Sequence, residues 1–385
     1  MKASNRITLV TALLALVAGA ALVYYVNRGP AELRIGLVMP LSGEMGEEGR
    51  SILQAAQMAA EEIRANGAGA PGARINVTIV PADDKGDDAV ALQAAEALLK
   101  QDVSAVVGHL TSGAAIAAAP AYARAGVPEL SATTHPRFTQ LGLPTTFRLV
   151  ANDDVQARAL GRYAAGEFKG QAFAVVDDGS VYGKGLADNA AAELQRAGQK
   201  LVLRKSYDAR SASFPEVADA VEHDHAAVVL TTMELPQATL LMRQLIAAGH
   251  KEVAVLGGDS LKTGPVPPEA TQMARFLVTT PVTDVREFGA GGRAFLNRYE
   301  QKYQHAPADT AHYVYDAVYL LAQAAAAEHS TRPGVLMKAL RKLDPAVPVT
   351  GYLRFREDGE LRYGAISLYT GSKGDWRLVA RSTDW

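Results

Sequence analysis

The chain of 385 residues contains no cysteine. Without thiols it can form neither a disulfide framework nor a thiolate metal site, and it offers no cysteine nucleophile and no N-terminal cysteine for lipid attachment. Strongly charged runs are also scarce, and 39 Lys and Arg stand against 41 Asp and Glu, a formal net charge of −2. Proteins that bind nucleic acids usually carry an excess of Lys and Arg, and this sequence has none. We therefore expect no nucleic-acid partner.

The sequence patterns of common catalytic sites are missing as well. There is no G-x-S-x-G turn, no phosphate-binding loop ending in GK[ST], no H-E-x-x-H and no G-x-G-x-x-G after a strand. Asp83 and Asp84 end an expected strand without a nucleophile and base beside them, so they are expected to bind loop backbone. His109, in the next loop, is expected to be a buried supporting residue. We predict no enzyme, no cofactor and no metal site.

Only one long apolar run occurs, at residues 7–26, after a basic N-terminus. As a secretory signal, 7–17 would form the apolar core and 18–20 (Ala-Gly-Ala) would resemble a cleavage site. As an uncleaved anchor, 7–26 is long enough to cross a hydrocarbon layer of roughly 30 Å, and its continued apolarity slightly favours this interpretation. Residues 1–32 are thus expected to be a signal or a membrane anchor. The remainder is expected in the periplasm or on the outer face of the cytoplasmic membrane. With no second such run, the chain is not itself expected to be a permease.

After residue 32, strand and helix patterns alternate strictly, which predicts an α/β fold with parallel sheets flanked by helices. The length favours two lobes, because the alternation restarts near residue 151. We predict lobe 1 from 33–150 and 283–350, and lobe 2 from 151–282 and 351–385. The tail should contain short antiparallel strands over 352–355, 362–369 and 376–380. Several crossovers between lobes would form a hinge that closes around a ligand.

Two hydroxyl-rich loops follow adjacent expected strands. Thr111, Ser112 and Gly113 stand where a helix over 114–125 should begin, and residues 131–134 (Ser-Ala-Thr-Thr) follow the next strand. In open parallel sheets, ligands bind outside the carboxyl ends of the strands, and a helix N-terminus favours an anionic group. Hydroxyls after a strand are also ordinary helix caps. Both interpretations stay open for this loop alone, and Thr111 is a candidate ligand residue under the first.

Several segments together carry a family resemblance. They are MPLSG over 39–43 with Gly49, Asp83-Asp84, VVGHLTS over 106–112, GVPELSATTHP over 126–136, FRLVANDDVQ over 147–156, YGKGLA over 182–187 and Tyr315-Asp316-Ala317. In this order and spacing the chain resembles the type I periplasmic solute-binding proteins, most closely their Leu/Ile/Val-binding branch, from residue 33 to the C-terminus. The resemblance implies a two-lobed protein that captures an amino acid or similar small polar solute by hinge closure and delivers it to an ABC permease. An alternative is a membrane-anchored sensor of the same fold that signals to a partner.

The resemblance also implies roles for individual residues. Ser112 and Thr134 would hold the ligand's α-carboxylate through hydroxyl and backbone N–H groups, and the carbonyl of Ala132 would accept from its α-ammonium group. Tyr182 would reach over from lobe 2 and help to close the cleft. Asp259 falls where the family often places an acid that pairs with the ammonium group, although it is shorter than the usual glutamate.

Two further positions depart from the family pattern. Glu48 stands where relatives carry an aromatic residue, and Met233-Glu234 occupies the stretch where a tyrosine of lobe 2 is expected. If Glu48 and Glu234 both face the cleft, an aliphatic ligand side chain would be a poor fit for desolvated carboxylates, and a cationic or strongly hydrogen-bonding ligand would be favoured. A charge pair about 4 Å apart interacts by about 4 kcal/mol at an effective dielectric of about 20. If either glutamate points to solvent, this preference disappears, and the sequence leaves both possibilities open.

Overall fold

The computed structural model of the chain describes residues 31–67, 75–344, 346–372 and 374–382. The predicted signal core or membrane anchor over 7–26 lies outside these residues. Within the described ranges, no helix combines the length and apolarity that a membrane span requires.

Lobe 1 is built on a parallel sheet of five strands in the order β2-β1-β3-β4-β5. The strands are β1 (Ala31–Met39), β2 (Ile75–Asp83), β3 (Ala105–Gly108), β4 (Glu129–Ser131) and β5 (Thr146–Arg148), and the helices between them are α2 (Gly46–Asn66), α3 (Asp88–Leu99), α4 (Ser112–Ala125) and α5 (Arg137–Gln140). The predicted alternation is confirmed, and the short α5 is an addition to it. Gly49 is required in α2 because a Cβ atom there would lie 2.1 Å from the carbonyl oxygen of Pro40.

Lobe 2 is built on a seven-stranded sheet in the order β14-β13-β10-β9-β8-β6-β7, whose last five strands run parallel. Its elements are α6 (Asp153–Glu167), β6 (Ala172–Asp177), α7 (Val181–Arg196), β7 (Lys200–Ser206), α8 (Pro215–Glu222), β8 (Ala226–Thr231), α9 (Leu235–Ala247), β9 (Ala254–Gly257), the 3-10 turns η1 (Asp259–Leu261) and η2 (Ala270–Gln272), and β10 (Arg275–Thr280). Phe173 and Val175 face α6 and α7, whereas Ala174 and Val176 face α8 and α9. Burial on both faces explains why β6 is continuously apolar.

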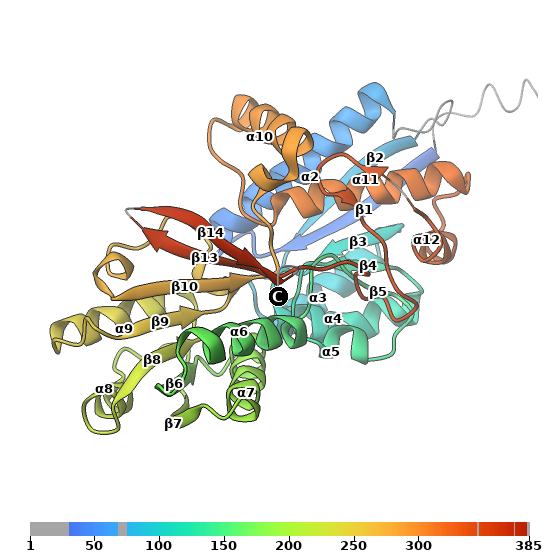
Figure 1. The fold of residues 1–385 in the computed structure, drawn as a ribbon. Helices are drawn as coiled ribbons and strands as arrows, with labels where there is room; N and C mark the ends of the chain where they lie inside the picture. Colours follow the sequence, from blue (N-terminus) through green and yellow to red (C-terminus); the bar gives the residue numbers. More distant parts are fainter. Residues whose placement is uncertain (1–30, 68–74, 345, 373, 383–385) are drawn as a thin grey trace, which may run out of the picture.

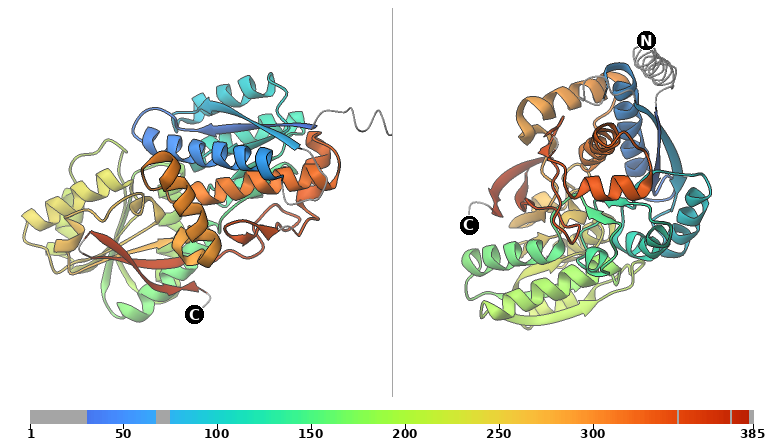
Figure 2. Two further views of the ribbon diagram at one scale, coloured as in Figure 1. Left: turned by 90° about the horizontal axis from the view of Figure 1, so that it is seen from above. Right: turned by 90° about the vertical axis from the view of Figure 1, so that its right-hand side faces the viewer.

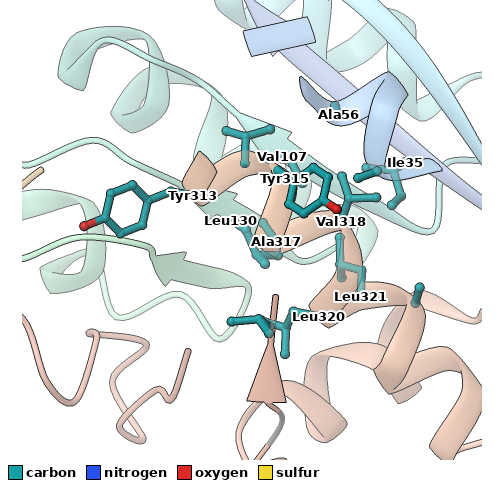
Figure 3. Packing of buried hydrophobic residues seen from close by; sticks show 14 of the residues in the cluster. Ile35, Ala56, Val107, Leu130, Tyr313, Tyr315, Ala317, Val318, Leu320 and Leu321 are labelled. Atoms are coloured by element: carbon teal, nitrogen blue, oxygen red, sulfur yellow. The ribbon is translucent and has the colours of Figure 1, made fainter. Parts of the chain in front are cut away.

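After β10 the chain returns to lobe 1 through η3 (Val285–Phe288), α10 (Gly289–Tyr303), α11 (Ala311–Ala327) and α12 (Pro333–Leu340). Helix α11 runs beside α2 against the first sheet (Figure 2). In Figure 3, Val107 and Leu130 of the sheet lie with Ala317 and Val318 of α11 in one cluster of buried side chains. Helix α11 thus completes the core of lobe 1.

The tail differs from the prediction. Strands β11 (Ala346–Val347) and β12 (Gly351–Tyr352) form a small antiparallel pair. The buried side chain of Phe355 packs on Phe147 in lobe 1, with ring centroids 5.1 Å apart. The predicted strand over 362–369 begins only at Ser367, because β10 ends at Thr280, which pairs with Ser367.

Strands β13 (Ser367–Ser372) and β14 (Asp375–Arg381) then extend the sheet of lobe 2 as an antiparallel ribbon (Figure 1). Since Leu353 and Phe355 belong to the core of lobe 1, the packing argues for moving the third lobe boundary from 351 to between Leu361 and Ile366.

Arg148, at the end of β5, ties the tail to the loop after β4. Its fully buried guanidinium group donates from Nε to both carboxylate oxygens of Glu360 at 3.1 Å. Nη1 donates to the carbonyl oxygen of Thr133 at 2.5 Å, and Nη2 donates to that of His135 at 2.9 Å. One side chain therefore holds the backbone on both sides of Thr134, a predicted ligand residue.

Replacing Arg148 by Met should lower the free energy of unfolding by roughly 3–5 kcal/mol, because it leaves the Glu360 carboxylate buried without its cation. Urea denaturation of Arg148→Met and of the exposed Arg137→Met, as the matched control, measures the difference. Equal stability of the two variants would contradict a structural role for this ion pair.

Candidate functional site

The predicted ligand residues all lie in loops or helix starts that follow the carboxyl ends of strands. Lobe 1 contributes Glu48, Thr111, Ser112, Ala132 and Thr134, and lobe 2 contributes Tyr182, Glu234 and Asp259. We call these eight residues the interlobe site. Parallel pairing within each sheet brings the loops of one lobe to one edge, which is the position that ligands occupy in such sheets.

The two hydroxyl-rich loops of lobe 1 contact each other directly. The Ser112 hydroxyl accepts a hydrogen bond from the Thr133 hydroxyl at 2.8 Å and lies 3.4 Å from the backbone N–H of His135. It therefore keeps its own hydrogen for another acceptor. Thr111 precedes α4 but makes no side-chain cap, and its buried hydroxyl has no partner among the described residues. The Thr111 hydroxyl therefore does not act as a helix cap, and capping does not explain why a threonine stands at this position.

A buried layer of polar side chains supports these loops. His109 is fully buried, with Nδ1 2.6 Å from an oxygen of Asp84 and Nε2 3.2 Å from the Tyr122 hydroxyl. The Ser131 hydroxyl donates to the carbonyl oxygen of His109 at 2.7 Å and so ties the two loops together. Asp83 accepts from the backbone N–H of its neighbouring loops. The predictions for His109, Asp83 and Asp84 as supporting residues are confirmed.

In lobe 2, Asp259 lies at the centre of a hydrogen-bond cluster. The Tyr182 hydroxyl and the Gln156 side-chain amide each donate to its Oδ1 at 2.9 Å. Burial raises the pKa of Asp259, and these two hydrogen bonds partly offset that effect. Tyr182 is thus held within lobe 2 by Asp259. Its predicted movement over a ligand stays a prediction.

Sequence reasoning did not single out two residues of α6 beside this cluster. Gln156 is fully buried, and its Oε1 has no hydrogen-bond partner among the described residues. Asp153, one turn earlier, is equally buried, and its carboxyl forms a hydrogen bond with the Thr134 side chain. Burial, with the nearby Asp259 carboxyl, raises the pKa of Asp153 well above its ordinary value. Both residues lie in the segment 147–156 that carries the family resemblance, but their local pattern is that of an ordinary first helical turn.

The two unusual glutamates lie in different lobes and share Asp259 among the carboxyls that raise their pKa values. Glu48 is half-buried in the first turn of α2, and burial with the carboxyls of Asp309 and Asp259 raises its pKa to about 7. Glu234 precedes α9 and remains accessible to solvent. Desolvation by the surrounding protein, followed by the carboxyls of Asp178, Glu48 and Asp259, raises its pKa to about 8. The two glutamates therefore influence each other across the boundary between lobes, and their contact with a ligand stays a prediction.

The unliganded protein should lose stability as the pH rises from about 5 to about 8. Glu48 and Glu234 have folded-state pKa values of about 7 and about 8 against an ordinary 4.5. The folded chain therefore binds more protons than the unfolded chain in this range, and the free energy of unfolding falls with pH until both groups are ionised.

Melting temperatures at several pH values measure this slope. The double variant Glu48→Gln, Glu234→Gln should show a flatter profile than the wild type. Glu47→Gln, an exposed change in the same turn of α2, is the matched control and should keep the wild-type slope. Superimposable profiles of the double variant and the wild type would contradict the shifted pKa values.

Comparisons with known proteins agree with this architecture. Residues 32–370 match a family model described as periplasmic binding protein. The Leu/Ile/Val-binding protein homolog 1 of Brucella abortus (strain 2308) is 30% identical over 359 residues, which cover 93% of this chain and 95% of that protein.

Two solved structures share the fold. The leucine binding protein LivK of Thermotoga maritima has a TM-score of 0.80 at 21% identity, covering 92% of this chain and 100% of that one. The branched-chain amino acid transporter substrate binding protein LivJ of Streptococcus pneumoniae, in complex with isoleucine, has a TM-score of 0.76 at 24% identity, covering 91% and 98%. The chain therefore belongs to the type I periplasmic binding proteins, a family of solute-binding proteins and not of enzymes.

Proposed function

We propose that this protein is the extracytoplasmic solute-binding component of an ABC importer and captures an amino acid or a related small polar solute between its lobes. The observation that carries the proposal is the pairing of opposite chemistry at the interlobe site. Lobe 1 offers the Ser112 hydroxyl at the start of α4, and lobe 2 offers the Asp259 carboxylate within a hydrogen-bond cluster. A zwitterionic ligand carries one group suited to each.

The anionic side of the ligand fits lobe 1. The first N–H groups of a helix have no partner inside the helix and carry a partial positive charge, which favours a carboxylate. Ser112 is the first residue of α4, and its hydroxyl has a hydrogen to donate. Thr134, almost fully buried in the adjoining loop, would add a hydroxyl or N–H. These groups together would hold the α-carboxylate.

The ammonium side fits lobe 2. Tyr182 and Gln156 both donate to Oδ1 of Asp259, which leaves Oδ2 to accept from an ammonium group. Desolvation raises the pKa of this carboxyl, and a bound cation would favour its ionised form. The carbonyl oxygen of Ala132 would provide a second acceptor from lobe 1. The ligand would then be bonded to both lobes and would favour their closed arrangement.

The chain crosses between the lobes three times: after β5, after β10 and between Leu361 and Ile366. We propose the sheet-based lobes as the moving units, with the first two boundaries near 150 and 282. Three adjoining crossings restrict the motion to hinge bending. Lys262 of lobe 2 forms an ion pair with Asp309 of lobe 1, with Nζ 2.5 Å from Oδ2, so the lobes also contact each other outside the crossings.

Delivery to an ABC permease and a periplasmic or membrane-anchored location belong to the same proposal. They are supported by the family and by the Leu/Ile/Val-binding name of the Brucella relative. Stimulation of the ATPase activity of a co-reconstituted permease by the liganded protein would support transport. The anchored sensor would instead bind ligand without stimulating a permease, and N-terminal sequencing of the mature protein would find residues 7–26 retained.

An amino acid should raise the melting temperature of the protein, and the double variant Ser112→Ala, Thr134→Val should bind it roughly 100-fold more weakly. The reason is that a hydrogen bond to a charged group contributes about 1.5–3 kcal/mol, and 1.4 kcal/mol is a factor of about ten in affinity. Calorimetric titration measures the change, with the exposed Thr271→Ala as a control that should bind like the wild type. Unchanged affinity in the double variant would rule out the carboxylate site.

Binding should also make the molecule more compact. Small-angle scattering should show a smaller radius of gyration at saturating ligand than without ligand, because a solute bonded to both lobes favours their closure. An identical radius of gyration for free and fully liganded protein would contradict the hinge mechanism.

A further inference from the structure

The interlobe site contains more negative charge than an α-amino acid with an aliphatic side chain can satisfy. Asp259 alone is sufficient for an α-ammonium group. Glu48 and Glu234 add two carboxyls that the α-ammonium does not require. The charged groups that most strongly shift the pKa of either glutamate are all carboxyls.

A series of contacts links the turn that contains Asp259 to the first turns of α2, which contain Glu48, across the boundary between lobes. The backbone N–H of Lys262 donates to the carbonyl oxygen of Asp259 at 2.9 Å, so both residues belong to one turn. The Lys262 ammonium group is paired with Asp309. The residue before Asp309 donates its backbone N–H to the Ser51 hydroxyl at 2.8 Å, and Ser51 lies one turn along α2 from Glu48. The segments that carry Asp259 and Glu48 therefore adjoin the same contact between the lobes.

Glu234 joins them from the neighbouring strand of lobe 2. Strands β8 and β9 are paired, and Thr231 stands opposite Gly257 in their register. Glu234 follows Thr231 by three residues, and Asp259 follows Gly257 by two. The Ser260 hydroxyl donates to the carbonyl oxygen of Met233 at 2.8 Å and closes the two loops on each other. Glu234 and Asp259 thus leave the sheet side by side.

The buried cations of this region are already engaged. Besides its pairing with Asp309, Lys262 has its Nζ 4.9 Å from the ring centroid of Tyr369. Arg148 is paired with Glu360. Neither is among the groups that shift the pKa of Glu48 or Glu234.

An unsatisfied acceptor beside Asp259 points the same way. The Oε1 of the fully buried Gln156 has no hydrogen-bond partner among the described residues. Gln156 donates to Asp259, and the Asp259 carboxyl raises the pKa of Asp153. A buried acceptor without a donor costs about 1–3 kcal/mol. The region therefore has an excess of acceptors that a donor-rich ligand would relieve.

We propose that Glu48 and Glu234 form a second cation subsite, so that the preferred ligand is an amino acid whose side chain carries a positive charge. This inference rests on the proposed function: Asp259 takes the α-ammonium group, and the two glutamates, one from each lobe, take the side-chain cation. The side-chain cation then also bridges the lobes. An aliphatic side chain bound there would displace water from the half-buried Glu48 and the exposed Glu234 without supplying a cation to either carboxyl.

Pairs of amino acids of similar shape test the subsite by calorimetric titration of the full chain. L-Arginine should bind at least about tenfold more tightly than its neutral counterpart L-citrulline. L-Lysine should likewise bind at least about tenfold more tightly than L-norleucine. A tenfold difference in affinity is the smallest effect expected of a charge pair from which water is excluded. The double variant Glu48→Gln, Glu234→Gln should lose most of this preference. Glu47→Gln, the exposed neighbour on α2, should retain it.

The outcomes separate this inference from the proposed function. Equal or tighter binding of citrulline, norleucine or leucine would overturn the cation subsite and leave amino acid capture intact. Binding of cadaverine more tightly than lysine would support the subsite and overturn the carboxylate site of lobe 1. Binding of none of these compounds would overturn both. Melting curves of the double variant exclude misfolding, because removing the repulsion between carboxyls should raise its stability near pH 8.

Discussion

Parallel strand pairing is the constraint on which the rest of this structure depends. Strand β3 pairs in parallel with β1 on one side and with β4 on the other, so the loops that follow all three strands emerge at one edge of the sheet. Helix α4 must then start at that edge, with Ser112 as its first residue. Its alanines at 114, 115, 118 and 119 are fully buried. The meeting of the hydroxyl-rich loops of lobe 1 at one edge of the sheet is thus a consequence of strand direction and close helix packing.

The interlobe site is built at a cost to the stability of the unliganded protein. Glu48, Glu234, Asp153 and Asp259 all have raised pKa values with burial as the main cause. Arg148 and Glu360, by contrast, form a buried ion pair. Unpaired buried carboxyls also occur outside the interlobe site, as at Glu129 of β4.

The buried polar residues near the interlobe site differ in how well the sequence predicts them. His109 and Asp84 could be assigned to a buried layer because a histidine beside a strand end needs partners, and the structure supplies Asp84 and Tyr122. Asp153 and Gln156 could not be assigned in the same way. Their burial and the missing partner of the Gln156 Oε1 result from the packing of α6 against lobe 2 and from the neighbouring Asp259, and nothing in their local pattern distinguishes them from an ordinary first helical turn.

The sequence by itself determined the α/β class, the two parallel arrays and the positions of the hydroxyl-rich loops. These features follow from local periodicity and from the fixed direction of βα units. Only the tertiary structure decided that the tail between Leu353 and Leu361 packs on lobe 1, because that depends on the contacts of Phe355 and Glu360 with distant residues. It also decided that Glu48 and Glu234 lie near the same carboxyl. Residues nearly two hundred positions apart come under the influence of one carboxyl, that of Asp259, only after folding.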